Sequence, residues 1–536
     1  MNPPASSPAS RWNWLARLDQ FAEHYSDILN PILVKEARQA LKSRQFSITF
    51  SLLLAAAWGW TLYAIRAGDP GIYYVPSGKS FLFGYYFVLA IPMLVVVPIA
   101  AHRSLASEID DGTLDLLTVT NLSPLQIIFG KLASASLQMM LYFVVLLPCV
   151  AFAYVLRGVD VLSIAAIIGM TISVGFVLTL VGLFLASLPR GRTGQLTMLI
   201  IMIVLVGIVI PSMISIAQEM IFTNIFAEGI KSFAIFSLMA ILLTISFGLL
   251  LLRTAAAELS PPSENRSTPI RWALLGFQTT VLGCLTFTFM TSGRNDPILI
   301  LAIFAGTFFW VVIGALMVGE GTSLTPRVRR DLPGSFLARS MLTWCTPGPA
   351  TGLVFSVTAL ITFCLYLLMI RVLAAPITAN TTFVPTIDPL PYFFTLIGYA
   401  MLTLTLTRLA MKLVRLHSNT HPSVSLAVLV IVIGSLALIP YAIGLLINDY
   451  RTFSWNYGQL TNSFWTLATL ESGSLPELAP YLIFAIGGIS WLIALATTGQ
   501  RALPLRVATP ARVQEEIAAD QEKSAAAEEE FDPLAG

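Results

Sequence analysis

The sequence predicts an all-α membrane protein with about twelve transmembrane helices and an amphipathic interfacial helix at its N-terminal end. The 536-residue chain is 56% hydrophobic and only 11% charged, and its mean hydropathy is +0.79. Soluble domains carry about 25% charged residues, so this composition excludes an ordinary soluble fold. Apolar stretches long enough to cross a bilayer as helices recur along the chain. The net charge of +2 gives no indication of a nucleic-acid partner.

Residues 1–46 are predicted to form a cytoplasmic segment that contains the interfacial helix. From Trp14 onward, apolar side chains recur every three or four residues, which is typical of a helix lying flat on a membrane. Pro31 suits a first helical turn, so we expect a helix to restart there. Lys35 and Arg38 on its polar side indicate contact with anionic lipid surfaces, although basic residues also flank ordinary membrane spans.

Twelve apolar stretches follow, each of about 20 residues. They fall at roughly 47–65, 81–101, 132–156, 161–188, 196–218, 232–252, 272–292, 297–318, 350–370, 391–410, 423–447 and 479–498. If both termini are cytoplasmic, 24 of the 31 Lys and Arg residues lie on the cytoplasmic side and 7 on the other. The positive-inside rule therefore predicts a multi-pass protein with both termini in the cytoplasm.

The spans divide into two six-helix modules, at 47–255 and 256–500, followed by an acidic cytoplasmic tail at 501–536. Each module places a charged cytoplasmic loop between its second and third spans, at 102–131 and 320–349. Six is an even number, so a repeat of this kind would be parallel. The residue-level similarity is weak, and related halves or unrelated modules both remain open. The Ala/Glu-rich tail is expected to be solvated and disordered.

Prolines interrupt several of the predicted spans. Each one removes a backbone hydrogen bond and is expected to bend its helix. Tolerated kinks in packed helices are as good an interpretation as moving hinges. The residues concerned are Pro92, Pro98, Pro148, Pro211 and Pro440.

The loop at 102–131 is the most charged segment between spans. Acidic residues alternate there with leucines, so the segment offers an apolar stripe beside an acidic one. Such a segment can lie at the membrane surface and present a face to a soluble partner. We therefore hypothesise that this loop receives mechanical work from a separate ATPase.

The chain lacks visible machinery of its own. The interiors of the predicted spans carry no Asp, Glu, Lys, Arg or His, whereas ion-driven carriers generally need a buried ionisable group. All four histidines, including His102, lie in polar flanks, and no HExxH motif or paired catalytic carboxylate is present. The four cysteines form no CxxC motif and are interpreted as apolar fillers. No soluble segment is long enough for a nucleotide-binding domain, so we expect no bound metal or cofactor, and ATP on a partner chain.

Two segments resemble the type-2 ABC transporter permeases. The first, which resembles the entry helix of that family, is Asn30–Glu36 with Arg38 and Arg44. The second, which resembles its coupling helix, is Glu108–Leu117 followed by Thr120, Ser123-Pro124 and Gly130-Lys131. The resemblance covers roughly residues 28–255. It implies the permease subunit of an ABC exporter in a bacterial inner membrane, with an ATP-binding cassette ATPase as a separate partner subunit.

In that family the loop between spans two and three docks into the ATPase. The resemblance therefore implies coupling contacts at Glu108, Asp110, Asp111, Gly112, Thr113 and Asp115. It also implies that three residues of the entry helix, Lys35, Glu36 and Arg38, pack near this loop. Gly112 has a physical interpretation as well, because glycine permits the backbone change that ends one short helix and starts another. A solvated acidic face is the alternative.

The chain departs from the family in its number of spans. The usual permease has six spans and works as a dimer, so twelve indicate either a fused pair or a six-span permease with an added module. A second permease copy remains a candidate partner, together with membrane lipids. The basic residues of the loop at 320–349 are either a second docking point or topology determinants. They are Arg327, Arg329 and Arg330.

Three rival functions stay open. An ion-driven secondary transporter or channel would work without an ATPase, and a membrane scaffold would move no substrate. A membrane-embedded enzyme is disfavoured because no catalytic constellation is present. An uncharged interior suits lipids, lipid-linked glycans, apolar drugs or peptides, so the sequence does not select the substrate.

Overall fold

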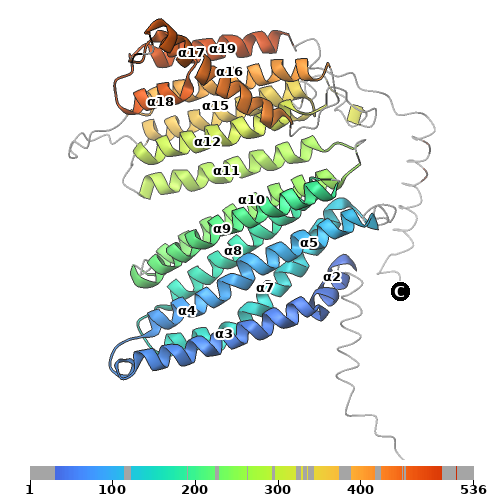
Figure 1. The fold of residues 1–536 in the computed structure, drawn as a ribbon, viewed down its shortest axis with the longest axis vertical. Coiled ribbons are helices and arrows are strands. Elements are labelled where there is room, and N and C mark those ends of the chain that lie inside the picture. Colours follow the sequence, from blue (N-terminus) through green and yellow to red (C-terminus); the bar gives the residue numbers. More distant parts are fainter. Residues whose placement is uncertain are drawn as a thin grey trace, which may run out of the picture. The chain divides into compact units, whose positions relative to one another are not determined.

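The computed structural model is helical throughout its described part and contains 12 helices that are long and apolar enough to cross a membrane (Figure 1). This confirms the predicted fold class. The described residues are 31–113, 122–189, 191–223, 229–261, 264–291, 296–321, 328–329, 335, 343–373, 388–416, 424–449, 451, 454–497, 515 and 519. The amphipathic series that starts at Trp14 and the acidic tail, apart from two of its residues, lie outside them.

The chain forms two compact units, Met1–Ser260 and Pro261–Gly536. The first contains a short helix and six candidate spans, namely α2 (Pro31–Lys42), α3 (Arg44–Gly68), α4 (Gly78–Ile91) continued by α5 (Val97–Asp110), α7 (Pro124–Val155), α8 (Val161–Ser187), α9 (Arg192–Thr223) and α10 (Ile230–Leu259). The second has six spans and a short helix, namely α11 (Ser267–Thr291), α12 (Asp296–Val318), α15 (Pro349–Leu373), α16 (Leu390–Val414), α17 (Val424–Ile447), α18 (Ser463–Glu471) and α19 (Ala479–Ala496).

The short helix α2 is separated from the first span by one capping residue. The Ser43 hydroxyl donates to the Ala40 carbonyl at 2.7 Å and accepts from the Phe46 backbone N–H at 3.1 Å. One side chain thus closes the end of α2 and caps the start of α3. This break is what allows α2 to leave the line of the first span and pack along α7.

The two units share an order of helix packing. In the first unit the fourth span, α8, contacts α5, α7, α9 and α10. In the second unit the fourth span, α16, contacts the corresponding helices α12, α15, α17 and α19. The second and third spans also pack together in both units, as do the first and third. This correspondence favours related halves, because unrelated modules have no reason to repeat the same set of neighbours.

The second span of the first unit packs closely on α8. It passes through a π-helical turn at Pro92–Val96, which breaks the α-helical spacing at a proline. A Cβ atom added at Gly175 would lie 3.1 Å from the Met93 carbonyl oxygen, and one added at Gly182 would lie 2.9 Å from another carbonyl of this span. Glycine at these two positions therefore permits the close approach.

The segment around Pro440 shows how a proline is accommodated within a span. Proline has no N–H to donate to the carbonyl of Leu436, one turn earlier in α17. The Thr461 hydroxyl donates to that carbonyl at 3.4 Å. The Gln459 side-chain amide donates to the carbonyl of Pro440 itself at 2.8 Å. The segment before α18 thus supplies donors that compensate for the interruption.

The closest helix contact in the second unit, between α16 and α19, yields a matched prediction. A Cβ atom added at Gly487 would collide with the Gly398 carbonyl oxygen, whereas one added at Gly488 would meet nothing within 4 Å. We expect Gly487→Ala to lower the free energy of unfolding by about 1–3 kcal/mol through overpacking. Gly488→Ala should be neutral or stabilising by up to about 1 kcal/mol, because alanine favours the helix. Thermal unfolding of both variants in detergent checks this, and equal effects would contradict the packing.

Candidate functional site at the end of the second span

The second span of the first unit ends in a glycine cap. Helix α5 closes at Asp110, and Gly112 adopts φ +67°, in the left-handed region. The Gly112 N–H donates to the Ile109 carbonyl at 3.2 Å, and the Thr113 hydroxyl donates to the Glu108 carbonyl at 3.2 Å. These bonds satisfy carbonyls that the helix end would otherwise leave free. The predicted role of Gly112 in ending a helix is confirmed.

The acidic residues at this cap face outward. The side chains of Asp110 and Asp111 are exposed. Within the described residues, no hydrogen bond or ion pair occupies either carboxylate. The chain resumes at α7, where Ser123 and Gln126 form a reciprocal capping box. Asp115, the last predicted coupling contact, lies in the stretch 114–121 outside the described residues.

A buried lysine near the start of α7 joins three helices. Lys131 Nζ lies 3.1 Å from Glu36 Oε1 on α2 and 3.0 Å from Glu108 Oε2 on α5. It also donates to the Ser104 hydroxyl at 2.8 Å. The Lys131 side chain is only 2% exposed, against 12% for Glu36 and 17% for Glu108. We call the set Lys131, Glu36, Glu108 and Ser104 the lysine clamp.

The lysine clamp shows which of the predicted docking residues already interact within the chain. Glu108 carries ion pairs to Lys131 and, at 4.0 Å, to Lys35, so its carboxylate is committed within the chain. Glu108 therefore has a bracing role within the chain, beside the docking role that the resemblance implies. Lys35 and Glu36 lie beside the loop, whereas Arg38 is exposed on α2. Among the described residues of the cap, Asp110 and Asp111 keep exposed carboxylates that could meet another protein.

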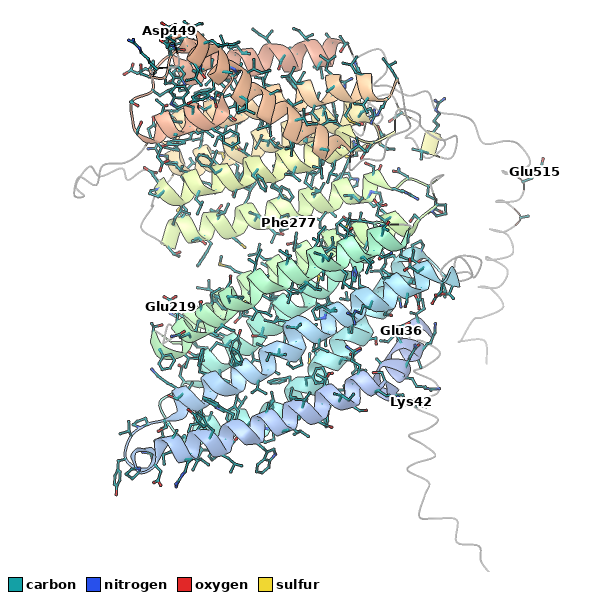
Figure 2. All side chains as sticks on the ribbon, in the orientation of Figure 1. Glu36, Lys42, Glu219, Phe277, Asp449 and Glu515 are labelled. Carbon is teal, nitrogen blue, oxygen red and sulfur yellow. The ribbon has the colours of Figure 1, made fainter. Side chains whose placement is uncertain are left out.

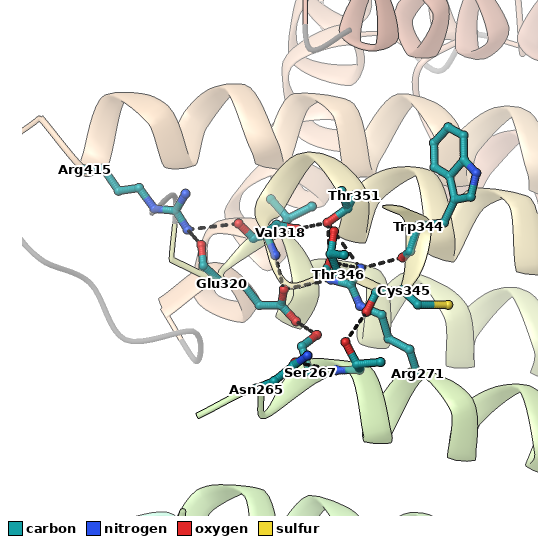
Figure 3. Close-up of polar contacts among 12 residues, drawn as sticks. Asn265, Ser267, Arg271, Val318, Glu320, Trp344, Cys345, Thr346, Thr351 and Arg415 are labelled. Carbon is teal, nitrogen blue, oxygen red and sulfur yellow. Dashed lines mark hydrogen bonds and ion pairs between the residues drawn. The ribbon is translucent and has the colours of Figure 1, made fainter. Parts of the chain in front are cut away.

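The second unit contains a comparable node at the end of its second span, shown in Figure 3. Arg271 of α11 is fully buried and donates to Glu320 Oε2 at 2.8 Å. The same guanidinium donates to the Trp344 carbonyl at 2.7 Å, the Thr346 carbonyl at 2.5 Å and the Thr351 hydroxyl at 3.2 Å. The planar guanidinium of an arginine has several N–H groups, so it can donate to acceptors on different segments at once.

Glu320 connects this node to the surrounding helices. Its carboxylate accepts from the Ser267 hydroxyl and from the Gly348 N–H, both at 2.6 Å. Its backbone carbonyl accepts from Arg415 at 2.7 Å. We call Arg271, Glu320 and these partners the arginine node. It ties together the ends of α11, α12, α15 and α16, as Figure 3 shows.

The three arginines considered for a second docking point are mostly outside the description. Arg327 and Arg330 are not among the described residues. Arg329 is described and is exposed. The structure therefore does not select between a docking role and a topology role for this loop.

Several ionisable side chains are buried within the helices, at or just beyond the ends of the apolar stretches, whose interiors were expected to carry none. His102 lies inside α5, not in a polar flank, and is buried with Nδ1 2.9 Å from the Gly182 carbonyl oxygen. Lys131, Arg271 and Arg408 are also buried within helices that extend beyond the apolar stretches. The cause is that each side chain finds acceptors in a neighbouring helix or segment, which offsets the cost of burial.

Sequence reasoning did not identify Arg271 and Glu320 as a pair. They flank the seventh and eighth spans. The only sequence signal at either position is a charged residue at the end of a span. Among the described residues, no group of three or more His, Cys, Asp or Glu side chains could hold a metal ion.

No protein-family model, curated protein or solved structure matches this chain. The chain is a polytopic membrane protein with 12 candidate spans. Its resemblance to the type-2 permeases rests on the entry-helix and loop motifs of the sequence.

Proposed function

We propose that this chain is the permease subunit of an ATP-driven ABC exporter, moved by a separate ATPase that docks at the end of the second span. The observation that carries the proposal is the pairing of an exposed acidic helix end with a buried brace directly behind it. Asp110 and Asp111 are exposed at the cap, and Glu108, in the preceding turn, is held by Lys131. A partner that grips the cap therefore grips a supported helix and not a loose loop.

The lysine clamp gives a route for the applied force. A load on the end of α5 passes through Lys131 to α7 and through Glu36 to α2. The second and third spans and the interfacial helix would consequently move together. An ATPase can drive such a movement only if it binds one arrangement of the spans more tightly than the other. The exposed carboxylates suit basic groups on the ATPase, which would orient docking.

Charge reversal at the cap tests the docking surface. In the full chain, we expect Asp110→Lys with Asp111→Lys to reduce association with the ATPase by about tenfold or more, because like charges facing each other cost several kcal/mol. The measurement is the amount of ATPase that co-purifies with the variant from the native cell. Glu219→Lys, at an exposed position of α9, is the matched control and should leave association unchanged. Undiminished association in correctly folded double variant would contradict the docking role.

An ion-driven carrier is the second candidate, favoured by the buried ionisable groups Lys131 and Arg271. Both are engaged in ion pairs at span ends, whereas a coupling ion needs a group that can bind and release it. This carrier would move its solute uphill in liposomes with only a sodium or proton gradient. The exporter proposed here would be inert under those conditions.

The shared packing order of the two units bears on stoichiometry. One chain supplies two six-span units, where a six-span permease needs two copies. We extend the proposal accordingly, with the two units acting as the paired halves of one transporter. The arginine node would then occupy the place in the second unit that the lysine clamp occupies in the first.

A further inference from the structure

An open apolar groove runs between the interfacial helix α2 and the third span α7. Its volume is about 480 Å³, within the range of about 300–1,000 Å³ typical of ligand sites. The lining comes from both helices and consists of Leu33, Val34, Ala37, Ala133, Ser136, Leu137 and Met140. The only hydroxyl among these side chains, that of Ser136, donates to the Leu132 carbonyl at 2.9 Å. The groove therefore offers hydrocarbon contacts and no free polar group from its side chains.

The apolar surface continues from the groove along α7. Leu137, Met140, Val144 and Leu147 follow one another at intervals of three or four residues, so they share one face of the helix. Their exposed fractions lie between 41% and 57%. A chain seated in the groove thus has a continuous apolar track toward the middle of the span.

Helix α2 also carries three exposed basic residues close in sequence to those that line the groove. Lys35, Arg38 and Lys42 recur at intervals of three and four on α2, and all three are exposed. Arg38 lies one turn after Val34, which lines the groove, and we call Arg38 and Lys42 the basic rim. The acidic residue of this helix, Glu36, is instead paired with the buried Lys131. Figure 2 marks Glu36 and Lys42 on α2.

We propose that the groove between α2 and α7 binds one acyl chain of an anionic phospholipid, whose phosphate is held by Arg38 and Lys42. The hydrocarbon lining selects the chain, and the basic rim selects a headgroup with net negative charge. A zwitterionic lipid satisfies the first requirement but gains less from the second. This inference does not depend on the ATPase proposed above, because its residues and contacts belong to the chain alone.

Occupation of the groove would act on the lysine clamp. A lipid chain packed between Ala37 and Ala133 bridges α2 and α7, the two helices that Glu36 and Lys131 also connect. Bound lipid therefore reinforces the same joint from the apolar side. We expect the anionic phospholipid to raise the unfolding temperature of the purified chain more than a zwitterionic one does.

The test is a lipid titration of the full chain in detergent, with bound lipid detected by native mass spectrometry. The probes are phosphatidylglycerol and phosphatidylcholine with identical acyl chains. We expect one phosphatidylglycerol molecule to bind more tightly than any further phosphatidylglycerol and more tightly than any phosphatidylcholine. In Arg38→Gln with Lys42→Gln, its dissociation constant should rise about 30-fold, since each basic residue near a charged membrane surface contributes about 1 kcal/mol. Ala133→Phe, which fills the groove, should weaken binding of both lipids.

The control for charge alone is Arg253→Gln, at an exposed position of α10, which should leave binding unchanged. Both charge substitutions lie on exposed positions, so the result does not depend on the tolerance of the groove for phenylalanine. Equal binding of the two lipids, or an unchanged dissociation constant in the double variant, would overturn the proposal. So would the absence of any tightly bound lipid, the outcome expected if residues 1–30 of the chain fill the groove.

Discussion

Replacing Lys131 by methionine is expected to lower the free energy of unfolding by about 3–5 kcal/mol, the range for breaking a buried ion pair by removing one partner. Methionine fills a similar volume but leaves Glu36 without a cation and Glu108 with only the exposed Lys35, at 4.0 Å. The two partly buried carboxylates then lose most of the interaction that offsets their desolvation. The joint between α2, α5 and α7 should therefore loosen.

The measurement is the thermal or denaturant unfolding of the full chain in detergent. Arg44→Met, at the exposed start of α3, removes a positive charge from the same region and should have little effect. Adding Glu36→Gln and Glu108→Gln to the Lys131→Met variant should restore much of the lost stability, because no unpaired charge remains. Equal melting of Lys131→Met and Arg44→Met would contradict the clamp.

Replacing Arg271 by methionine should destabilise the second unit by a similar amount, about 3–5 kcal/mol. The substitution removes the cation that faces Glu320, leaves the Trp344 carbonyl without its Arg271 donor, and leaves the Thr346 carbonyl with only the Thr351 hydroxyl. Arg271→Lys keeps the charge but cannot reproduce the planar fork. We therefore expect lysine to recover only part of the loss.

Unfolding of the full chain again provides the measurement, and Arg253→Met at an exposed position is the matched control. A probe placed in each unit adds a sharper readout, because the structure assigns Arg271 to the unit that starts at Pro261. Its removal should lower the transition seen in that unit first. Complete recovery by lysine would show that charge alone, and not the shape of the acceptor set, holds the node.

The local features of this fold were predictable from the sequence. Hydropathy located the spans because a bilayer demands a fixed length of apolar helix, and no tertiary information enters that demand. The helix end at Gly112 was also predictable, since it depends on the backbone preference of one residue. Features of this kind are encoded within a few neighbouring positions.

The charged contacts were not predictable in the same way. Lys131 and Glu36 are separated by 95 positions, and Arg271 and Glu320 by 49. A linear pattern shows that these residues flank spans but not which ones meet. The resemblance therefore implied a docking contact at Glu108 without revealing that its carboxylate is engaged by two lysines of its own chain.

The burial of His102 was missed for a related reason. The apolar stretch ends at Ala101, so the ring was expected in a polar flank. The helix continues to Asp110, and Gly182 on α8 leaves room for the ring and accepts its hydrogen bond. A hydropathy window detects where apolar residues stop, and it does not detect a neighbouring helix that offers a polar residue a buried partner.

We propose that this membrane chain is moved by a separate ATPase that binds the end of its second span. The most direct measurement is gentle purification of the full chain from the membranes of its native cell, with every co-purifying protein identified and quantified by mass. The account predicts an ATP-binding cassette ATPase in a fixed stoichiometric ratio to the chain. A chain that is repeatedly recovered intact and folded without any ATPase subunit would contradict it.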